Sequence, residues 1–434
     1  MKTMTKLTLL YLSLFLATTI IGSILLYLPI TGRKPISIID AFFVATSAFT
    51  VTGLSTVDVP KQFNDLGYFV IMSLIQIGGL GIVTLTIFIL ILSKKRISFK
   101  NRELLMISWN NDDDSGLLNI AMKIVLFSLT VEFVGFLFLN FVFMHDYGLW
   151  KGGYISLFTS ISAFNNAGFS LFSDNMMSYS HNFIINIVVP LLIIIGGVGY
   201  IVFLDLWKTN RFIKLSLHSK IVISTTTILI LVGTILFWLL EFNNTLKGQV
   251  WHDKLMTSFF QSVTTRTAGF NSVDIGAIND STILLFIVLM FIGAAPMSTG
   301  GGIKVTTFTL VVVYLFSQIK GIKHPHLFKK SLDLEQMYKA ILVFIISIML
   351  IIATTFILLI LNPRIGLNKI IFEVVSAFGT VGVSTGITAD LTDISKVVIM
   401  LLMIIGKIGI LIILSIFTTS KQDSYYYVKE KVQL

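Results

Sequence analysis

Long apolar runs recur along the whole chain, and this pattern restricts the possible folds more than any other feature. Eight such runs cover residues 7–29, 66–93, 117–144, 183–207, 219–241, 281–317, 338–361 and 394–417. A helix of about 20 apolar residues crosses a hydrocarbon core of roughly 30 Å. With 55% hydrophobic and 12% charged residues among 434, the chain also has too few polar side chains to cover a soluble fold. The sequence therefore predicts an all-α polytopic membrane protein.

Lysine and arginine residues are concentrated in alternate loops, near residues 94–102, 208–220 and 320–330, and in both terminal segments. By the positive-inside rule, these loops and both termini lie in the cytoplasm. We interpret residues 1–29 as a retained first helix, because the apolar run is too long for a signal peptide and no cleavage site follows it. The basic residues behind the net charge of +10 are concentrated in these loops and termini. This distribution indicates a lipid bilayer as partner and excludes nucleic acid.

Shorter stretches rich in Ser, Thr, Phe and Gly lie between the members of each consecutive pair of apolar runs. They cover about 40–56, 153–170, 251–271 and 368–386. Each is too short to span the membrane and enters it from outside, which predicts a re-entrant loop. Such irregular backbone is tolerated at membrane depth only where it is buried in protein or lines water.

The four stretches align without gaps at Ser47–Ser55, Ser162–Ser170, Val263–Asn271 and Ser376–Ser384. The following helices carry a second, weaker repeat, Gly78-Gly-Leu-Gly81, Gly196-Gly-Val-Gly199 and Gly406-Lys-Ile-Gly409. We therefore predict four pseudo-repeats of helix, re-entrant pore loop and helix around one central ion pore. Their boundaries are 1–95, 96–215, 216–332 and 333–420, followed by a cytoplasmic tail at 421–434.

Four copies of such a loop can place four backbone segments around one axis. A dehydrated cation needs a ring of oxygen dipoles, and backbone carbonyls supply it without a fixed charge. Glycine allows the backbone angles that turn carbonyls inward, although a single glycine could equally serve helix packing. Four glycines in register favour a selectivity filter. The predicted filter residues are Val51, Thr52, Gly53, Asn166, Ala167, Gly168, Thr267, Ala268, Gly269, Thr380, Val381 and Gly382.

The four loops, particularly Thr50-Val-Thr-Gly53 and Arg266-Thr-Ala-Gly-Phe-Asn271, resemble those of the Trk/Ktr/HKT superfamily of potassium transporters. The resemblance covers essentially the whole chain, and without extra N-terminal helices the chain is most similar to the Ktr-type ion-translocating membrane subunit. It implies potassium uptake across a bacterial cytoplasmic membrane by a homodimer on a cytoplasmic ring of RCK regulatory subunits.

The transported ion would be K+, bound at the filter only. No organic cofactor is expected in this chain, whereas a nucleotide (ATP/ADP or NAD) is expected on the partner. Gly53 favours potassium, since a serine there goes with sodium permeation in the family.

By this topology three charged residues, Lys407, Arg266 and Glu373, are buried within the membrane, and intramembrane charge indicates function by default. Lys407 stands where other repeats have Gly79 and Gly197, and we predict that it faces the pore as an electrostatic barrier. The alternative is a lysine that snorkels to the interface. Arg266 would repel cations if it faced the ion path, so its guanidinium is expected behind the filter. Glu373 is the predicted counter-charge, in a structural pair that supports the filter.

The run at 281–317 is too long for one span, at about 55 Å as a continuous helix. Its centre contains proline and three consecutive glycines, which break helices. The resemblance assigns this segment, about 294–304, as an intramembrane gate loop under the filter; a kinked helix is the alternative. The gate-loop residues are Ala295, Pro296, Ser298, Thr299, Gly300, Gly301, Gly302 and Lys304.

Two other functions compete with potassium uptake. One is a sodium-permeating or sodium-coupled cation transporter of the same superfamily. The other is an intramembrane enzyme, which would need several polar catalytic groups at one depth. Only Arg266, Glu373, Lys304 and Lys407 are available for that role. We therefore expect a transporter and not an enzyme.

Overall fold

The fold is that of a computed structural model, which describes residues 2–92, 103–106, 117–209 and 211–417. The predicted tail at 421–434 and most of the first basic loop lie outside the described residues. Helices dominate the described part of the chain, where the strands are limited to β1 (His326–Leu327) and β2 (Lys330–Ser331), which form one short antiparallel hairpin.

The helices follow one another in four successive sets with the same order, which we call repeats 1 to 4. Repeat 1 contains α1 (Lys2–Tyr27), α2 (Ile38–Thr50), α3 (Val59–Gln62), α4 (Asp65–Leu80) and α5 (Ile82–Leu92). Repeat 2 contains α7 (Leu117–Tyr147), α8 (Leu149–Phe164), η1 (Met177–Tyr179), α9 (Phe183–Val198), α10 (Tyr200–Lys208) and η2 (Phe212–Lys214). Repeat 3 contains α11 (Leu217–Glu241), α12 (Trp251–Thr264), η3 (Ile275–Ala277), α13 (Asp280–Phe291) and α14 (Val305–Ile319). Repeat 4 contains α15 (Leu334–Leu361), α16 (Leu367–Gly379), η4 (Thr388–Asp390), α17 (Asp393–Ile408) and α18 (Ile410–Phe417).

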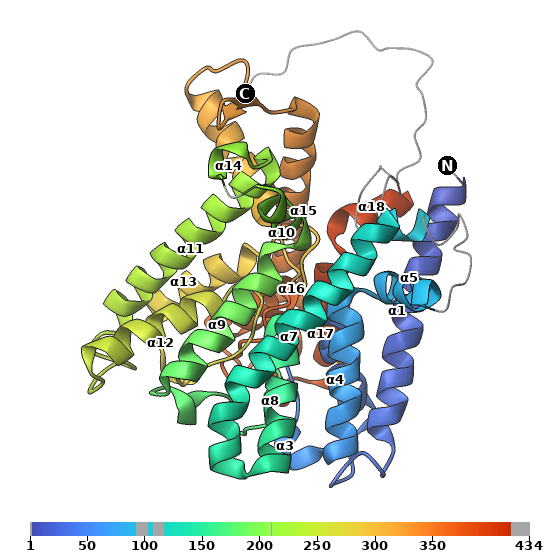
Figure 1. Cartoon of the computed structure of the whole chain (residues 1–434), viewed down its shortest axis with the longest axis vertical. Helices are drawn as coiled ribbons and strands as arrows, with labels where there is room; N and C mark the ends of the chain where they lie inside the picture. Colours follow the sequence, from blue (N-terminus) through green and yellow to red (C-terminus); the bar gives the residue numbers. More distant parts are fainter. Residues whose placement is uncertain (1, 93–102, 107–116, 210, 418–434) are drawn as a thin grey trace.

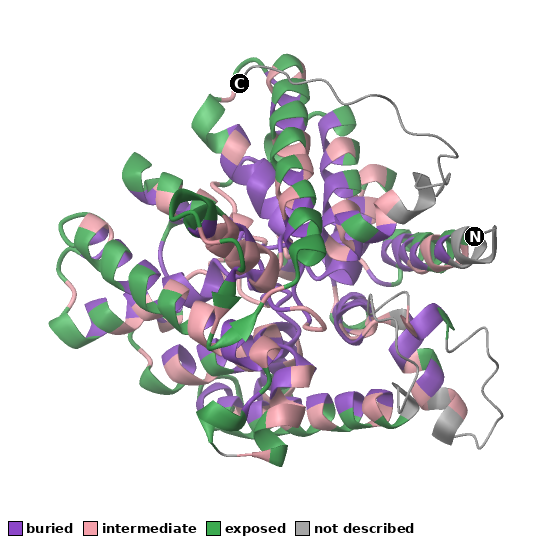
Figure 2. Cartoon of the chain, turned by 90° about the horizontal axis from the view of Figure 1, so that it is seen from above, coloured by how far each residue is buried: buried purple, intermediate pink, exposed green. Residues whose placement is uncertain are grey.

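The first helix of each repeat is a long apolar helix at the periphery. The portions long and apolar enough to cross a membrane are Thr8–Tyr27, Asn119–Tyr147, Leu217–Glu241 and Leu334–Leu361. No more than 39% of their most apolar windows is buried inside the protein, so most of their apolar side chains are left for lipid. Figure 2 shows the same arrangement from above, with buried residues gathered at the centre and exposed ones around them. In Figure 1 the start of α1 lies at the same end of the molecule as the junction between α14 and α15, and α3 lies at the opposite end.

The second helix of each repeat is a short helix buried at the centre. These four helices, α2, α8, α12 and α16, have 13 to 16 residues, or roughly 20 to 24 Å at 1.5 Å per residue. They are too short to span a membrane, and the residues of their last turns are almost fully buried. The predicted re-entrant segments therefore end in the interior of the protein, where the chain turns back.

The third helix of repeats 1, 2 and 4 is interrupted, which corrects the expectation of continuous helices at 66–93, 183–207 and 394–417. The breaks fall at Gly81, Gly199 and Gly409, the last glycine of each repeated motif, with φ of 84°, 89° and 91°. Only glycine adopts this conformation without strain. The axis turns by 90° between α9 and α10. A glycine inside an apolar run costs a helix only about 1 kcal/mol, so the sequence pattern alone did not indicate a break.

The first glycine of the same motif has a packing role. A Cβ at Gly78, Gly196 or Gly406 would overlap the carbonyl oxygen of Phe49, Phe164 or Phe378, respectively. Each of these phenylalanines lies at or next to the carboxyl end of the short helix of the same repeat. The glycines therefore let the third helix press against the point where the short helix ends, which positions the loop that follows.

Candidate ion pathway

The glycines of the four loops form a ring around one point. A Cβ built on Gly53 would lie 2.5 Å from the carbonyl oxygen of Ala167, next to Gly168. From Gly168 the corresponding distance is 2.7 Å to the Ala268 oxygen, and from Gly269 it is 2.6 Å to the Val381 oxygen. A Cβ on Gly382 would overlap the carbonyl of Thr52, which closes the ring. The structure thus brings the four loops together in the order of the repeats.

Each loop has the same alternating backbone. The residues two positions before the glycines are left-handed, with φ of 58°, 59°, 70° and 49° at Val51, Asn166, Thr267 and Thr380. All four glycines also have positive φ. Successive carbonyls of an extended strand point to opposite sides, and left-handed residues between them turn the carbonyls toward a common side. All twelve residues predicted for the filter lie in these four segments.

The amide groups of the loops are bonded away from the ring. The N–H of Thr52 donates to the Ser47 carbonyl at 2.8 Å, and the Gly53 N–H donates to the Ser47 hydroxyl at 3.0 Å. Val381 and Gly382 make the same two bonds to Ser376, at 2.8 and 3.1 Å. Backbone oxygens are therefore the polar groups that remain on the inner side. Such a ring can replace the water of a dehydrated cation.

The non-helical segment Ile292–Lys304 lies directly below this ring. It interrupts the third helix of repeat 3, between α13 and α14, at the place where the other repeats have a single glycine. The Gly301 N–H donates to the Thr380 hydroxyl at 2.9 Å, and a Cβ on Gly300 would overlap the Thr267 hydroxyl. The segment therefore contacts the filter loops of repeats 3 and 4.

The same segment is also hydrogen-bonded to the helix breaks of two other repeats. The Ala295 N–H donates to the Gly197 carbonyl at 3.0 Å, and the Tyr200 N–H donates to the Met297 carbonyl at 3.1 Å. In repeat 4 the Gly406 carbonyl accepts from the Gly302 N–H at 3.2 Å. These bonds satisfy some of the backbone N–H and C=O groups that have no partner within the interrupted helices.

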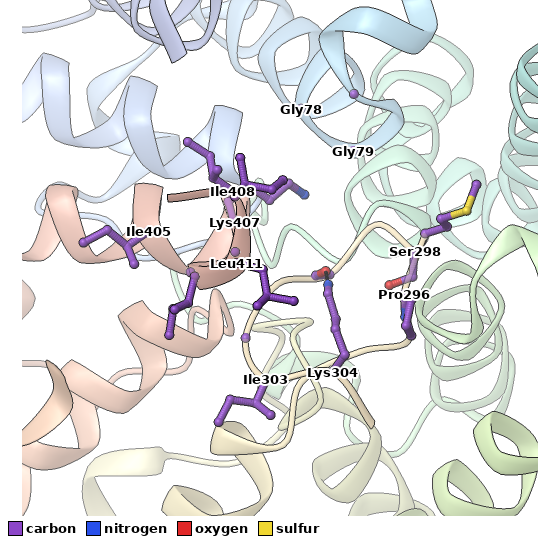
Figure 3. A pocket seen from close by; sticks show the side chains of 18 of the residues that line it. Gly78, Gly79, Pro296, Ser298, Ile303, Lys304, Ile405, Lys407, Ile408 and Leu411 are labelled. Carbon is purple, nitrogen blue, oxygen red and sulfur yellow. Dashed lines mark hydrogen bonds between the residues drawn. The ribbon is translucent and has the colours of Figure 1, made fainter. Parts of the chain in front are cut away.

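A cavity of about 330 Å³ opens below the ring (Figure 3). Residues of all four repeats line it, including Gly78 and Gly79 of α4, Tyr200 of α10, the segment Pro296–Lys304, and the break after α17. Figure 3 shows Lys304 on the gate-loop segment and Lys407 at the end of α17, both at this cavity. Filter ring, cavity and irregular segment therefore form one continuous site.

Lys407 is bonded to the irregular segment. Its Nζ donates to the Thr299 carbonyl at 2.5 Å, and the Lys304 Nζ donates to the Gly300 carbonyl at 2.7 Å. Lys407 lines the cavity. Its bond to the Thr299 carbonyl is a contact that the sequence did not indicate.

Arg266 and Glu373 do not form the predicted pair. The Arg266 guanidinium donates to the Gly293 carbonyl at 3.4 Å, whereas Glu373 accepts from the hydroxyls of Ser384, at 2.8 Å, and Thr388. No ion pair of the described residues joins them. The reason is local: Ser384 and Thr388, which follow α16 in the same repeat, satisfy the Glu373 carboxylate without a cation.

Sequence reasoning missed one buried carboxylate. Glu132 lies near the middle of α7 and is only 4% exposed. Gln76 and Asn165 donate to its two carboxylate oxygens at 3.0 and 2.9 Å. The signal was available in the sequence, because a lone acidic residue in a long apolar run is rare without a function.

Comparisons with known proteins were made for the whole chain. The family model for TrkH, a cation transport protein, matches residues 10–427. Ktr system potassium uptake protein B of Bacillus subtilis (strain 168) is 41% identical over 95% of this chain and 93% of its own length. The potassium/sodium uptake protein NtpJ of Enterococcus hirae is 36% identical over 97% and 95%, respectively.

A solved structure is also similar. The crystal structure of the potassium transporter TrkH from Vibrio parahaemolyticus superposes with a TM-score of 0.71 at 20% sequence identity, covering 93% of this chain and 84% of that chain. The likeness confirms the predicted fold class, an all-α membrane architecture with pore-loop repeats.

Proposed function

The chain belongs to the TrkH family of cation transport proteins, and from that premise we propose that it carries potassium ions into a bacterial cell through the ring and cavity described above. The relative from Bacillus subtilis, named as a potassium uptake protein, supports this ion. The chain is a transporter and not an enzyme, because the family and these relatives are transporters. The observation that carries the proposal is the closed ring of four loop glycines, each against the carbonyl of the next loop.

The ring selects by replacing water. A potassium ion that enters from outside loses its hydration shell and is coordinated by carbonyl oxygens of the four loops, without a fixed negative charge that would hold it too tightly. The twelve predicted filter residues supply this backbone. Below the ring, the cavity allows the ion to regain water before it leaves.

Ile292–Lys304 acts as the gate in this proposal. The segment lies under the filter, and Lys407 holds it there through the Thr299 carbonyl. A lysine ammonium in the cavity also repels a cation electrostatically. The described arrangement therefore has the features of a closed state, from which withdrawal of the segment would open the path. Arg266 supports this region through the Gly293 carbonyl, and Glu373 supports the loop of repeat 4.

Regulation by a partner is the finer part of the proposal. We expect a homodimer bound to a cytoplasmic ring of nucleotide-binding RCK subunits, with both termini of this chain in the cytoplasm. Support comes from relatives named as parts of a Ktr system, and from the basic connection between α14 and α15, which lies at the same end of the molecule as the start of α1 (Figure 1).

The second candidate is sodium transport, which the name of the Enterococcus hirae relative favours. The two candidates differ in the ion preference of the ring. Gly53, with no side chain to disturb the ring, favours potassium.

Reconstitution of the purified chain in liposomes tests the function directly. We expect an inward potassium gradient to set the membrane potential, with a reversal potential near that of potassium and away from that of sodium. Rescue of growth at low potassium in a transport-deficient strain, with and without a co-expressed RCK subunit, tests the partner. Absence of any cation flux from properly inserted protein, both with and without an RCK subunit, would refute the proposal.

A further inference from the structure

A polar network is buried between repeats 1 and 2 behind the filter. Its centre is Glu132 of α7, which lies among apolar helices and forms no ion pair within the described part of the chain. Its Oε2 accepts from Gln76 of α4 at 3.0 Å, and its Oε1 accepts from Asn165 at 2.9 Å. The Ser160 hydroxyl also donates to the Glu132 backbone carbonyl at 2.6 Å. Three elements are therefore joined at one carboxylate.

The network ends on the second filter loop. Asn165 caps the carboxyl end of α8, and its Nδ2 lies 3.0 Å from the Gln76 Oε1 and 2.9 Å from the Ile161 carbonyl. Its amide oxygen fills the space beside Gly79, where any Cβ would overlap it. Asn165 therefore has no freedom to rotate without losing these contacts.

The next residue along the chain continues the connection to repeat 3. Asn166 is left-handed, with φ of 59°, and its side-chain amide is hydrogen-bonded to the Thr267 hydroxyl at 3.1 Å. The same hydroxyl faces Gly300 of the gate segment. A continuous set of contacts thus runs from α4, through Glu132 and the second loop, to the third loop.

We propose that Glu132 is a positioning residue for ion selection, which holds Asn165 and thereby the carbonyls of the second filter loop in register with the other three. The inference rests on the proposed function and concerns the geometry of the same ring. In register, Asn165 corresponds to Arg266 of the third loop, which is likewise bonded to an acceptor outside its loop, the Gly293 carbonyl.

The physical argument is the cost of an unpaired donor. Without an acceptor at position 132, the Gln76 N–H₂ loses its partner and the Asn165 amide keeps only the Gln76 Oε1 and the Ile161 carbonyl, so the loop gains free energy by moving. Asn166 is left-handed, a conformation that is unfavourable for residues other than glycine. If its neighbour Asn165 moves, we expect Asn166 to leave this conformation. The carbonyl spacing of one quarter of the ring would then change.

The experiment compares Glu132→Leu with Glu132→Gln in the full chain. Glutamine keeps an oxygen that accepts from Asn165, which is the contact that the proposal requires, and loses only the acceptor of Gln76. We expect Glu132→Leu to lower the potassium-over-sodium permeability ratio about tenfold, and Glu132→Gln to remain within about twofold of the wild type. Ser128→Ala, one turn away on the same helix, is the matched control, and it should not change the ratio.

A second measurement does not depend on flux. Potassium should raise the melting temperature of the purified wild type more than sodium does, since a ligand that binds only the folded state stabilises it. Glu132→Leu should lose this difference, and Glu132→Gln should keep it. If Glu132→Leu does not accumulate in the membrane, Glu132→Met, an apolar side chain of similar length, removes the same acceptor and is judged by the same two measurements.

The outcomes separate the two levels of inference. Wild-type protein with no preference for potassium over sodium refutes the proposed function. A selective wild type with an equally selective Glu132→Leu variant, or Glu132→Met in its place, overturns only the positioning role. Equal loss in Glu132→Gln and Glu132→Leu would also overturn it, because the carboxylate charge and not its geometry would then decide selectivity.

Discussion

At the scale of single residues, the filter depends on backbone conformations that most side chains disfavour. Val51, Asn166, Thr267 and Thr380 are left-handed, at a cost of about 1 to 2 kcal/mol each. Bonds to the preceding short helices hold the loops in this conformation, such as those from Thr52 and Gly53 to Ser47. Side chains that disturb these few positions are therefore expected to change selectivity before they change the fold.

Gly53→Ser tests the ring at one position. With φ of 93° and the Ala167 oxygen 2.5 Å from the new Cβ, serine must displace the neighbouring carbonyl. We expect a lower potassium-over-sodium preference in reversal-potential measurements, with normal amounts of protein in the membrane. Gly148→Ser is the control, because Gly148 also has positive φ but no atom within 4 Å of a Cβ. Unchanged selectivity in a conducting Gly53→Ser protein would contradict the filter assignment.

Lys407→Ala tests the barrier in the cavity. Removing the ammonium releases the Thr299 carbonyl and lowers the electrostatic cost for a nearby potassium ion, which is about a few kcal/mol at an effective dielectric of 20. Potassium flux into liposomes should rise. Lys407→Arg keeps the charge and should remain close to the wild type. Equal flux in the alanine variant and the wild type would remove the barrier hypothesis.

At the scale of elements, the molecule is built from helices that stop inside the membrane region. Four short helices end at the filter, and the third helices of repeats 1, 2 and 4 break at a glycine with positive φ. The segment Ile292–Lys304 replaces this glycine in repeat 3. Its backbone is hydrogen-bonded to groups at the helix breaks of repeats 2 and 4 that have no partner within their own helices. The positions of these elements therefore depend on one another.

Substitutions at Gly409 and Gly199 allow the effect of backbone strain to be measured apart from the effect of contact with the gate segment. Gly409→Ala meets no atom within 4 Å, so only the left-handed backbone is penalised. Gly199→Ala carries the same strain and also places its Cβ 2.7 Å from the Pro296 carbonyl. We expect Gly409→Ala to lower the melting temperature modestly with normal flux, and Gly199→Ala to lower it further and to raise flux. Identical behaviour of the two variants would show that the gate contact has no effect.

Deletion of Ser298 to Gly302 tests the whole gate segment. The deletion removes the Thr299 acceptor of Lys407 and the Gly301 donor to Thr380. We expect potassium flux to rise and to become largely independent of the cytoplasmic partner, as measured in liposomes with and without an RCK subunit. A deleted protein that inserts, binds its partner and still closes without activating nucleotide would show that the gate lies elsewhere.

At the scale of the whole molecule, the four repeats are closed into a ring by contacts at their outer ends. Each contact joins the region where the third helix of one repeat begins to the short helix of the next. The contacts are Asp65 with Tyr154, His181 with Asp253, Asp280 with Asn368, and Lys396 with Asp40. The last pair joins repeat 4 to repeat 1, across 356 positions of sequence.

The Lys396–Asp40 pair should therefore contribute to stability of the closed ring. The Nζ lies 2.8 Å from the carboxylate, and the two side chains are only 10% and 19% exposed. We expect Lys396→Met and Asp40→Asn each to lower the melting temperature in detergent, and the double variant to lower it by less than their sum. The coupling should be about 1 to 2 kcal/mol. Additive effects would show that the pair does not close the ring.

The sequence by itself determined the membrane class, and it located the four loop segments whose glycines meet in the structure. The reason is that these features are local: apolar length sets the long helices, and glycine at a fixed register marks each loop. The irregular segment around Pro296 to Gly302 was also evident, because proline and consecutive glycines break helices regardless of their neighbours.

Only the tertiary structure decided which groups meet. Gly199 breaks its helix beside the Pro296 carbonyl of the gate segment, and Gly81 and Gly409 break theirs at the same position of the repeat. A single glycine in an apolar run does not reveal such a break. Arg266 was assigned to Glu373 by charge alone, yet the carboxylate is satisfied by two hydroxyls that follow its helix in the same repeat. The network at Glu132 joins residues 56 and 33 positions away in sequence, and no local pattern encodes a contact that exists only after the repeats have packed together.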